Sequence, residues 1–103
     1  MIFKRLKTVY YVYIVTNKTN TVLYVGVTND LKRRIKEHSD GETDGFTKKY
    51  KVNKLVYYEE YHKVINSIER EKQLKGWTRS KKNQLVESKN PDWISLNELL
   101  FEF

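Results

Sequence analysis

Apolar and polar positions form alternating blocks in the first half of the chain. Residues 9–15 are β-branched or aromatic throughout, residues 16–20 form a polar cluster, and residues 21–27 are again largely apolar. Two short apolar runs around a polar turn are typical of a β-hairpin. A third strand is predicted over residues 54–61, which are rich in Val and Tyr, and we expect it to join the hairpin as an antiparallel sheet.

Apolar residues four positions apart predict a helix directly after the hairpin. Leu31 and Ile35 would share the buried face of a helix over residues 30–38. Residues 39–45 contain glycine and acidic side chains and are expected to end this helix. The helix would therefore connect the second strand to the third.

Two longer helices are predicted after the third strand. The first covers residues 63–77, with Val64, Ile65 and Ile68 as its buried stripe. The second covers about residues 80–89 and ends before an Asn-Pro pair, because the residue that precedes proline disfavours the helical backbone. Both helices are expected to pack against the sheet.

The chain is predicted to form one domain. Residues 94–103 are expected to form a short amphipathic helix or tail, and no repeat, low-complexity tract or long linker divides the sequence. We therefore predict a single α+β domain over residues 1–103, with its core at about 9–97 and the element order β-β-α-β-α-α.

Length and charge favour a polymeric, anionic partner. A domain of 103 residues buries only about 60–70% of the surface of its unfolded chain, so a shallow site is more plausible than a deep pocket. The 20 Lys and Arg outnumber the 13 Asp and Glu, and the net charge of +7 attracts polyanions. Eight tyrosines shift the expectation towards nucleic acid, since rings stack on bases, although many of them must be core.

Other sequence features exclude several classes of protein. The chain has no cysteine, so it has neither disulfides nor a thiolate zinc site, which fits an intracellular protein. The apolar run at residues 9–15 is far shorter than the roughly twenty residues that cross a bilayer, and residues 1–5 show no signal-peptide pattern. We therefore expect a cytoplasmic protein with no membrane partner.

Four polar or aromatic side chains form the first candidate site. Arg34 and His38 would project from one helical face, where a phosphate could touch both, although a solvated basic face is the alternative. Tyr13 and Tyr24 lie on successive strands, where two phenols about 5 Å apart could bracket a water. Packing of buried tyrosines in a small sheet is the alternative for that pair.

Glu71 is the candidate carboxylate of the second half. On a helical wheel it falls about 60° from the centre of the predicted apolar stripe, whereas Glu69 lies more than about 90° away. An inward carboxylate needs a partner, because burial of an unpaired charge is costly. An ion pair with Lys75 and a divalent cation are both open at this point.

These motifs, taken in order, resemble the GIY-YIG nuclease superfamily, and in particular its small stand-alone bacterial members. Tyr11-Val12-Tyr13 and Tyr24-Val25-Gly26 correspond to the two motifs that name the family, and Arg34 follows the motif glycine by eight residues. The resemblance spans about residues 9–97 and implies a three-stranded antiparallel sheet flanked by helices. One departure is Tyr11 in place of the first motif glycine, since a ring there could stack on a base or block it.

The resemblance also implies roles for the candidate residues. Glu71 would bind a single divalent ion, Mg²⁺ or Mn²⁺, and Arg34 would stabilise the charge that develops on the phosphate. Tyr13 would position or activate the attacking water, with Tyr24 supporting it or contacting the phosphate. His38 would assist proton transfer or phosphate binding.

The sequence thus predicts a metal-dependent endonuclease that cleaves DNA in preference to RNA and recognises it by shape or charge, since no predicted element resembles a base-reading helix. A non-catalytic nucleic-acid-binding module on the same scaffold is the main alternative, and a small structural or interaction protein is another. DNA repair is one of several compatible settings. Two basic segments would hold the backbone outside the site, through Lys48, Lys49, Lys51, Arg79, Lys81 and Lys82.

Overall fold

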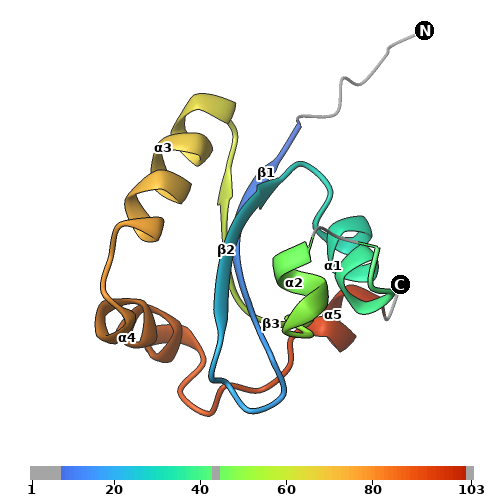
Figure 1. Ribbon diagram of the computed structural model, residues 1–103. Coiled ribbons are helices and arrows are strands. Elements are labelled where there is room, and N and C mark those ends of the chain that lie inside the picture. Colours follow the sequence, from blue (N-terminus) through green and yellow to red (C-terminus); the bar gives the residue numbers. More distant parts are fainter. Residues whose placement is uncertain (1–7, 43–44, 102–103) are drawn as a thin grey trace, which may run out of the picture.

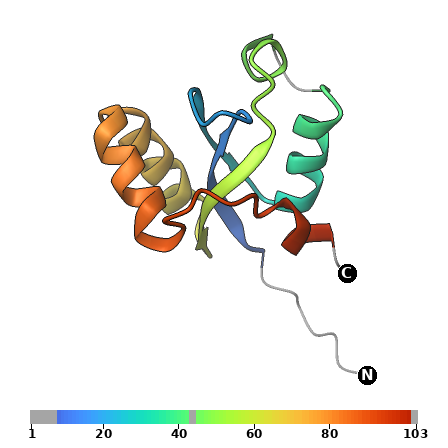
Figure 2. The same cartoon turned by 90° about the horizontal axis from the view of Figure 1, so that it is seen from below.

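A three-stranded antiparallel sheet lies between two layers of helices (Figures 1 and 2). The computed structural model describes residues 8–42 and 45–101. The strands are β1 (Tyr10–Thr16), β2 (Leu23–Thr28) and β3 (Lys54–Tyr61), and they pair in the order β2-β1-β3. The predicted hairpin, the third strand and the α+β class are confirmed.

Strand β1 is central and buried on both faces. Val12 and Ile14 belong to one hydrophobic cluster, while Tyr13 and Val15 belong to another on the opposite face. This explains why the strand reads as an uninterrupted apolar run, since a strand covered on both sides has no polar face. The side chains of successive residues alternate between the two layers of helices.

The helices divide between the two faces of the sheet (Figures 1 and 2). On one side lie α1 (Leu31–Ser39), α2 (Gly45–Lys49) and α5 (Asn97–Phe101). On the other side lie α3 (Val64–Lys75) and α4 (Arg79–Lys89). Each layer thus covers one of the two hydrophobic clusters.

Helix α2 corrects the predicted order of elements. The sequence indicated only a break at residues 39–45 and then a basic stretch, whereas the described part of the chain runs β-β-α-α-β-α-α-α. Five residues are too few to show a helical period, which explains the omission. The helix ends at Lys49, and the left-handed φ of 53° at Lys51 prevents the backbone from continuing as a helix.

The predicted buried stripe of α3 is wrong. Val64 and Ile65 are 46% and 56% exposed and Ile68 is half-buried, whereas Ser67 and Leu74 are completely buried. Ser67 satisfies its own hydroxyl by donating to a backbone carbonyl 2.6 Å away, so a small polar residue can occupy the interface with the sheet. Glu71, between Ser67 and Leu74 on the same face, does point inward, with its side chain 17% exposed.

Some expectations fall on residues outside the described ranges. Residues 1–5, for which no signal-peptide pattern is predicted, lie outside these ranges, as does the end of the predicted C-terminal segment at residues 102–103. Within residues 8–42 and 45–101, no helix combines the length and the apolar character that crossing a membrane requires.

Candidate active site

Tyr13 and Gly26 face each other across the β1–β2 pair. The ring of Tyr13 lies directly over Gly26: a Cβ atom built at this glycine would stand 2.8 Å from Cε2 of Tyr13 and closer still to its phenol oxygen. Such a contact is far inside van der Waals distance, so a side chain at this position would have to displace the ring. Glycine therefore lets the tyrosine ring cross the edge strand.

The hydroxyl of Tyr13 is held by two side chains of α1. Nε of Arg34 donates to the phenol oxygen over 3.2 Å, and Nε2 of His38 lies 3.2 Å from the same oxygen. Because a guanidinium can only donate, the phenol oxygen accepts from Arg34, while the tautomer of His38 determines which of the two groups donates in the second contact. The two α1 residues are one turn apart, so one helical face delivers both.

Burial sets the protonation state of Tyr13. The residue is 1% exposed, and burial raises the pKa of its hydroxyl to about 12, although the hydrogen bond and the charge of Arg34 act in the opposite direction. At neutral pH the group is therefore a phenol, which can orient its neighbours but is a poor base.

Tyr24 joins this cluster from the edge strand β2. It is paired with Val15 rather than with Tyr13, so the two tyrosines are diagonal neighbours on one face instead of direct partners. The rings of Tyr24 and Tyr13 each meet the ring of His38 edge-on, with centroid distances of 5.9 Å and 5.8 Å. Tyr24 remains half-buried and thus presents the more accessible phenol.

Glu71 approaches from the opposite layer of helices. Its carboxylate pairs with Nζ of Lys75 over 3.4 Å, and the same Nζ lies 5.9 Å from the ring centroid of Tyr24. The charge of Glu71 also reaches Tyr13, where it adds to the rise in the pKa of the phenol. The carboxylate on α3 and the cluster on α1 therefore meet around the edge strand β2.

The donor atoms near Glu71 fit one type of metal ion. Within the described ranges, no three His, Asp or Glu side chains gather into a ligand cluster. One carboxylate completed by waters and substrate oxygens is an arrangement that Mg²⁺ accepts, whereas zinc normally needs three or four protein ligands. The residues present therefore suit a hard divalent ion and do not suit zinc.

The first predicted basic segment lies beside the cluster. Lys48, Lys49 and Lys51 are exposed on and just after α2. A groove of about 350 Å³ runs from His38 past Lys48 and Lys51 to Asn53. These cations are placed where they could accompany a phosphate backbone that leaves the site.

The second predicted basic segment has other partners. Arg79 donates to the backbone carbonyls of Thr21 and Asn20 over 2.9 Å and 2.5 Å, which ties α4 to the β1–β2 turn. Lys81 lies 4.6 Å from the ring of Trp77. The side chain of Arg79 thus has a structural role, which the sequence could not show because the turn is 58 residues away. The remaining member, Lys82, is half-buried in α4.

Three residues near the site were missed by the sequence analysis. Phe46 on α2 and Tyr50 just after it continue the row of rings that begins at Tyr24, and Lys75 contacts both Glu71 and Tyr24. The sequence feature that could have identified the two rings is their spacing of four positions within a basic stretch. Tyr11, which replaces the first glycine of the family motif, packs edge-on against Tyr58, with a centroid distance of 6.1 Å.

A second charged network supports the sheet on the α3 side. Arg70 donates to both carboxylate oxygens of Glu59 over 2.9 Å each. The hydroxyls of Tyr57 and Tyr61 donate to the same carboxylate. The hydrogen bonds from Arg70 and these tyrosines hold the pKa of Glu59 at about 2, despite the opposing effect of burial.

Acid should therefore weaken the fold through Glu59. A carboxyl whose pKa is lowered on folding stabilises the protein above its unfolded pKa, near 4.5, and loses this effect as pH falls towards 2. We expect a loss of about 3 kcal/mol over that range, at about 1.4 kcal/mol per unit. Urea unfolding at several pH values should show a steeper acid loss for the native chain than for Glu59→Gln. Equal slopes would contradict this assignment.

Comparisons with known proteins identify the family of the chain. A family model described as the GIY-YIG catalytic domain matches residues 9–84. A UPF0213 protein of Clostridium perfringens is 40% identical over 80 residues, which are 78% of this chain and 85% of that protein. A UPF0213 protein of Haloquadratum walsbyi is 38% identical over 78 residues, 76% of this chain and 86% of that one.

A solved structure shows the same fold. The solution NMR structure of a UPF0213 protein from Bacillus halodurans superimposes with a TM-score of 0.54 at 32% sequence identity, over 82% of this chain and 89% of that one. The family model and these relatives together cover the strands, the α1 cluster and Glu71. The chain therefore belongs to the GIY-YIG family, among small single-domain proteins of the UPF0213 type.

Proposed function

We propose that this protein is a divalent-metal-dependent endonuclease that hydrolyses phosphodiester bonds in DNA and selects its substrate by shape. The GIY-YIG domain belongs to a nuclease superfamily, and its members generally use a divalent metal. The single observation that carries the proposal is the convergence around β2 of Arg34, the Tyr13–His38 pair and Glu71 from different elements. A basic, shallow surface of this kind suits a polyanion.

Arg34 is the proposed phosphate ligand. Its Nε is bound to Tyr13 and one terminal nitrogen lies 3.4 Å from Glu37, yet its side chain remains 29% exposed. The remaining N–H groups are therefore available to oxygens of a phosphate, and guanidinium groups suit the paired oxygens of such anions. In this position the cation stabilises the charge that develops as the P–O bond to the leaving group breaks.

Tyr13 and His38 act in this proposal by positioning Arg34. A phenol that is 1% exposed and has a pKa of about 12 does not take a proton from bulk water at neutral pH. The family resemblance implied that Tyr13 positions or activates the attacking water, and the proposal here gives it the positioning of Arg34 instead, because its phenol is buried. His38 holds the phenol from its other side, and the more accessible Tyr24 is the group that orients the attacking water.

Glu71 is the proposed metal ligand. A divalent ion supplies Lewis-acid stabilisation of the phosphate and the leaving oxygen. Lys75, which now pairs with Glu71, is 49% exposed and can turn outward at little cost when a cation replaces it. Together these residues would bind the phosphate between the guanidinium on one layer and the carboxylate-held ion on the other.

Metal removal provides the direct test. The native chain should cut at least one of labelled branched, nicked, single-stranded or duplex DNA in Mg²⁺ or Mn²⁺, and should cut nothing in EDTA. Matching RNA substrates, measured in parallel, decide between the two nucleic acids. Cleavage that persists in EDTA would overturn the metal dependence.

The Glu71–Lys75 ion pair supports a second candidate function. Lys75 already pairs with the carboxylate of Glu71, so this glutamate needs no metal ion as a partner. Such an ion pair is compatible with a nucleic-acid-binding module that has no catalytic activity. Salt-sensitive DNA binding without cleavage in any metal would favour that module over the nuclease.

A further inference from the structure

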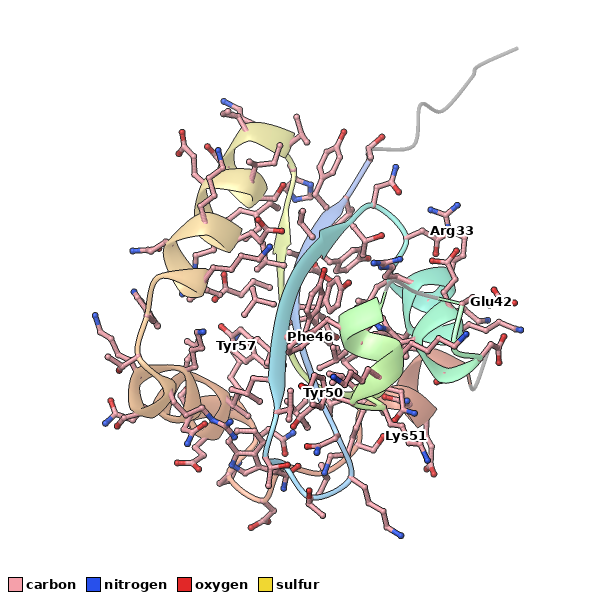
Figure 3. The ribbon with its side chains drawn as sticks, viewed as in Figure 1. Arg33, Glu42, Phe46, Tyr50, Lys51 and Tyr57 are labelled. Carbon is pink, nitrogen blue, oxygen red and sulfur yellow. The ribbon has the colours of Figure 1, made fainter. Side chains whose placement is uncertain are left out.

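A row of aromatic rings leads from the candidate site to the surface. The ring of Tyr24 meets His38 on one side and Phe46 on the other, with a centroid distance of 6.2 Å to Phe46. The ring centroid of Phe46 in turn lies 5.0 Å from that of Tyr50, which directly follows α2. In Figure 3, Phe46 and Tyr50 appear on the side of α2 nearest to β2. The row therefore begins beside the proposed phosphate site and continues onto α2.

Phe46 and Tyr50, the outer two rings of the row, are exposed to solvent. Phe46 is 47% exposed and Tyr50 is 43% exposed, although aromatic side chains of this size normally gain stability by burial. The two rings pack on each other, Phe46 also packs on Tyr24, and Nζ of Lys49 lies 5.4 Å from the centroid of the Tyr50 ring. Each ring thus presents part of its surface to a ligand without any rearrangement of the core.

Positive charge surrounds these rings. Lys48 and Lys49 lie between them in sequence and Lys51 follows, all exposed. The groove that starts at His38 shares Lys51 and Asn53 with a second groove of about 430 Å³, which is also lined by Lys18 and Lys54. A basic track therefore runs beside the aromatic row.

We propose that Phe46 and Tyr50 form a stacking platform for unpaired bases, so that the substrate carries a single-stranded segment next to the phosphate held by Arg34. The position of that phosphate rests on the proposed nuclease function. Exposed rings beside a cationic groove are the arrangement that binds single strands, because each base offers a π face and the backbone follows the lysines. In a duplex the base faces are covered by their neighbours, so duplex DNA exposes no face to these rings.

The platform can be tested by binding alone. Fluorescence anisotropy in EDTA would measure the affinity of the whole protein for a labelled single-stranded oligonucleotide and for the matching duplex. For Phe46→Ala we expect a loss of about tenfold on the single strand, and for the Phe46→Ala, Tyr50→Ala double variant about 100-fold. Duplex affinity should remain unchanged, because the lysines are intact.

Three further variants separate stacking from other effects. Phe46→Trp should retain single-strand affinity, whereas Phe46→Leu, apolar but without a ring, should lose it as Phe46→Ala does. Ile65→Ala removes a comparably exposed apolar side chain from α3, on the other layer, and should change neither affinity nor melting temperature. Equal losses on single strand and duplex, or unchanged binding by the double variant, would overturn the platform.

The outcome also separates this inference from the nuclease proposal. If the native chain cuts nothing in Mg²⁺ or Mn²⁺ while ring-dependent binding of single strands is present, the platform stands and the nuclease function fails. If cleavage is present and the double variant binds and cuts like the native chain, only the platform fails. In that second case the two exposed rings would be assigned to contact with another protein and not with bases.

Discussion

Replacing Glu71 by glutamine is expected to abolish metal-dependent cleavage while leaving the fold and DNA binding intact. Glutamine keeps the size of the side chain but removes the charge that would hold a hard cation. Lewis-acid stabilisation is worth several kcal/mol, so cleavage should fall by about 10³-fold or more, at about 1.4 kcal/mol per factor of ten. The lost ion pair with Lys75 should cost only about 0.3–0.5 kcal/mol of stability.

Glu69→Gln is the matched control for this variant. It makes the same chemical change two residues away on α3, where Glu69 is exposed, so it should retain near-native cleavage. Both variants raise the net charge by one, and binding of DNA in EDTA should be equal or slightly tighter in each. Loss of cleavage in Glu69→Gln but not in Glu71→Gln would show that Glu69, and not Glu71, is the functional carboxylate of α3.

Gly26→Ala is expected to damage cleavage and stability together. The added carbon would stand 2.8 Å from Cε2 of Tyr13, and both residues are buried, so the ring must move. Overpacking of this kind costs about 1–3 kcal/mol of stability. Displacement of the phenol also releases Nε of Arg34, and misplacement by about 1 Å can reduce a rate by about 10²-fold.

Two companion variants distinguish this mechanism from general instability. Gly76→Ala places the new carbon at an ordinary 3.5 Å from the carbonyl of Gln73, so chemical unfolding and cleavage should both stay near native. Adding Tyr13→Phe to Gly26→Ala removes the phenol oxygen but leaves Cζ of the ring just as close to the new carbon, so little stability should return and cleavage should stay low. Full recovery of cleavage in the double variant would contradict the positioning role of the hydroxyl.

Most of the fold could be predicted from the sequence, because the strands have a clear pattern of apolar residues separated by polar turns. The β-branched and aromatic run at residues 9–15 and the polar turn after it predicted the hairpin, and the structure adds that this first strand is central and covered on both faces. Helix α3 was placed correctly but with the wrong buried face. Its contact with the sheet uses Ser67 and Glu71 as well as Leu74, and hydrophobic periodicity cannot identify an interface that includes polar residues.

The site was less predictable than the fold because its contacts are long-range. The spacing of Arg34 and His38 suggested a shared face, but only the tertiary structure shows that both hold the hydroxyl of Tyr13. Likewise, Arg79 reads as a free cation in the sequence and is bound to the carbonyl of Thr21 in the structure. Charge and helical phase limit what a residue can do, and packing decides which partner it meets.

The position of Tyr13 on the central strand has a consequence for how the protein uses its folding free energy. The phenol is fixed by two covered faces of β1 and by Gly26, so the conformational entropy of the group that orients Arg34 is lost during folding and not during turnover. The guanidinium of Arg34, which is fixed only through part of its N–H groups, is then the group that a bound substrate has to immobilise. A chain of this small size can thus present a preorganised anion site without a deep pocket, because the rigidity of its most buried strand takes the place of enclosure.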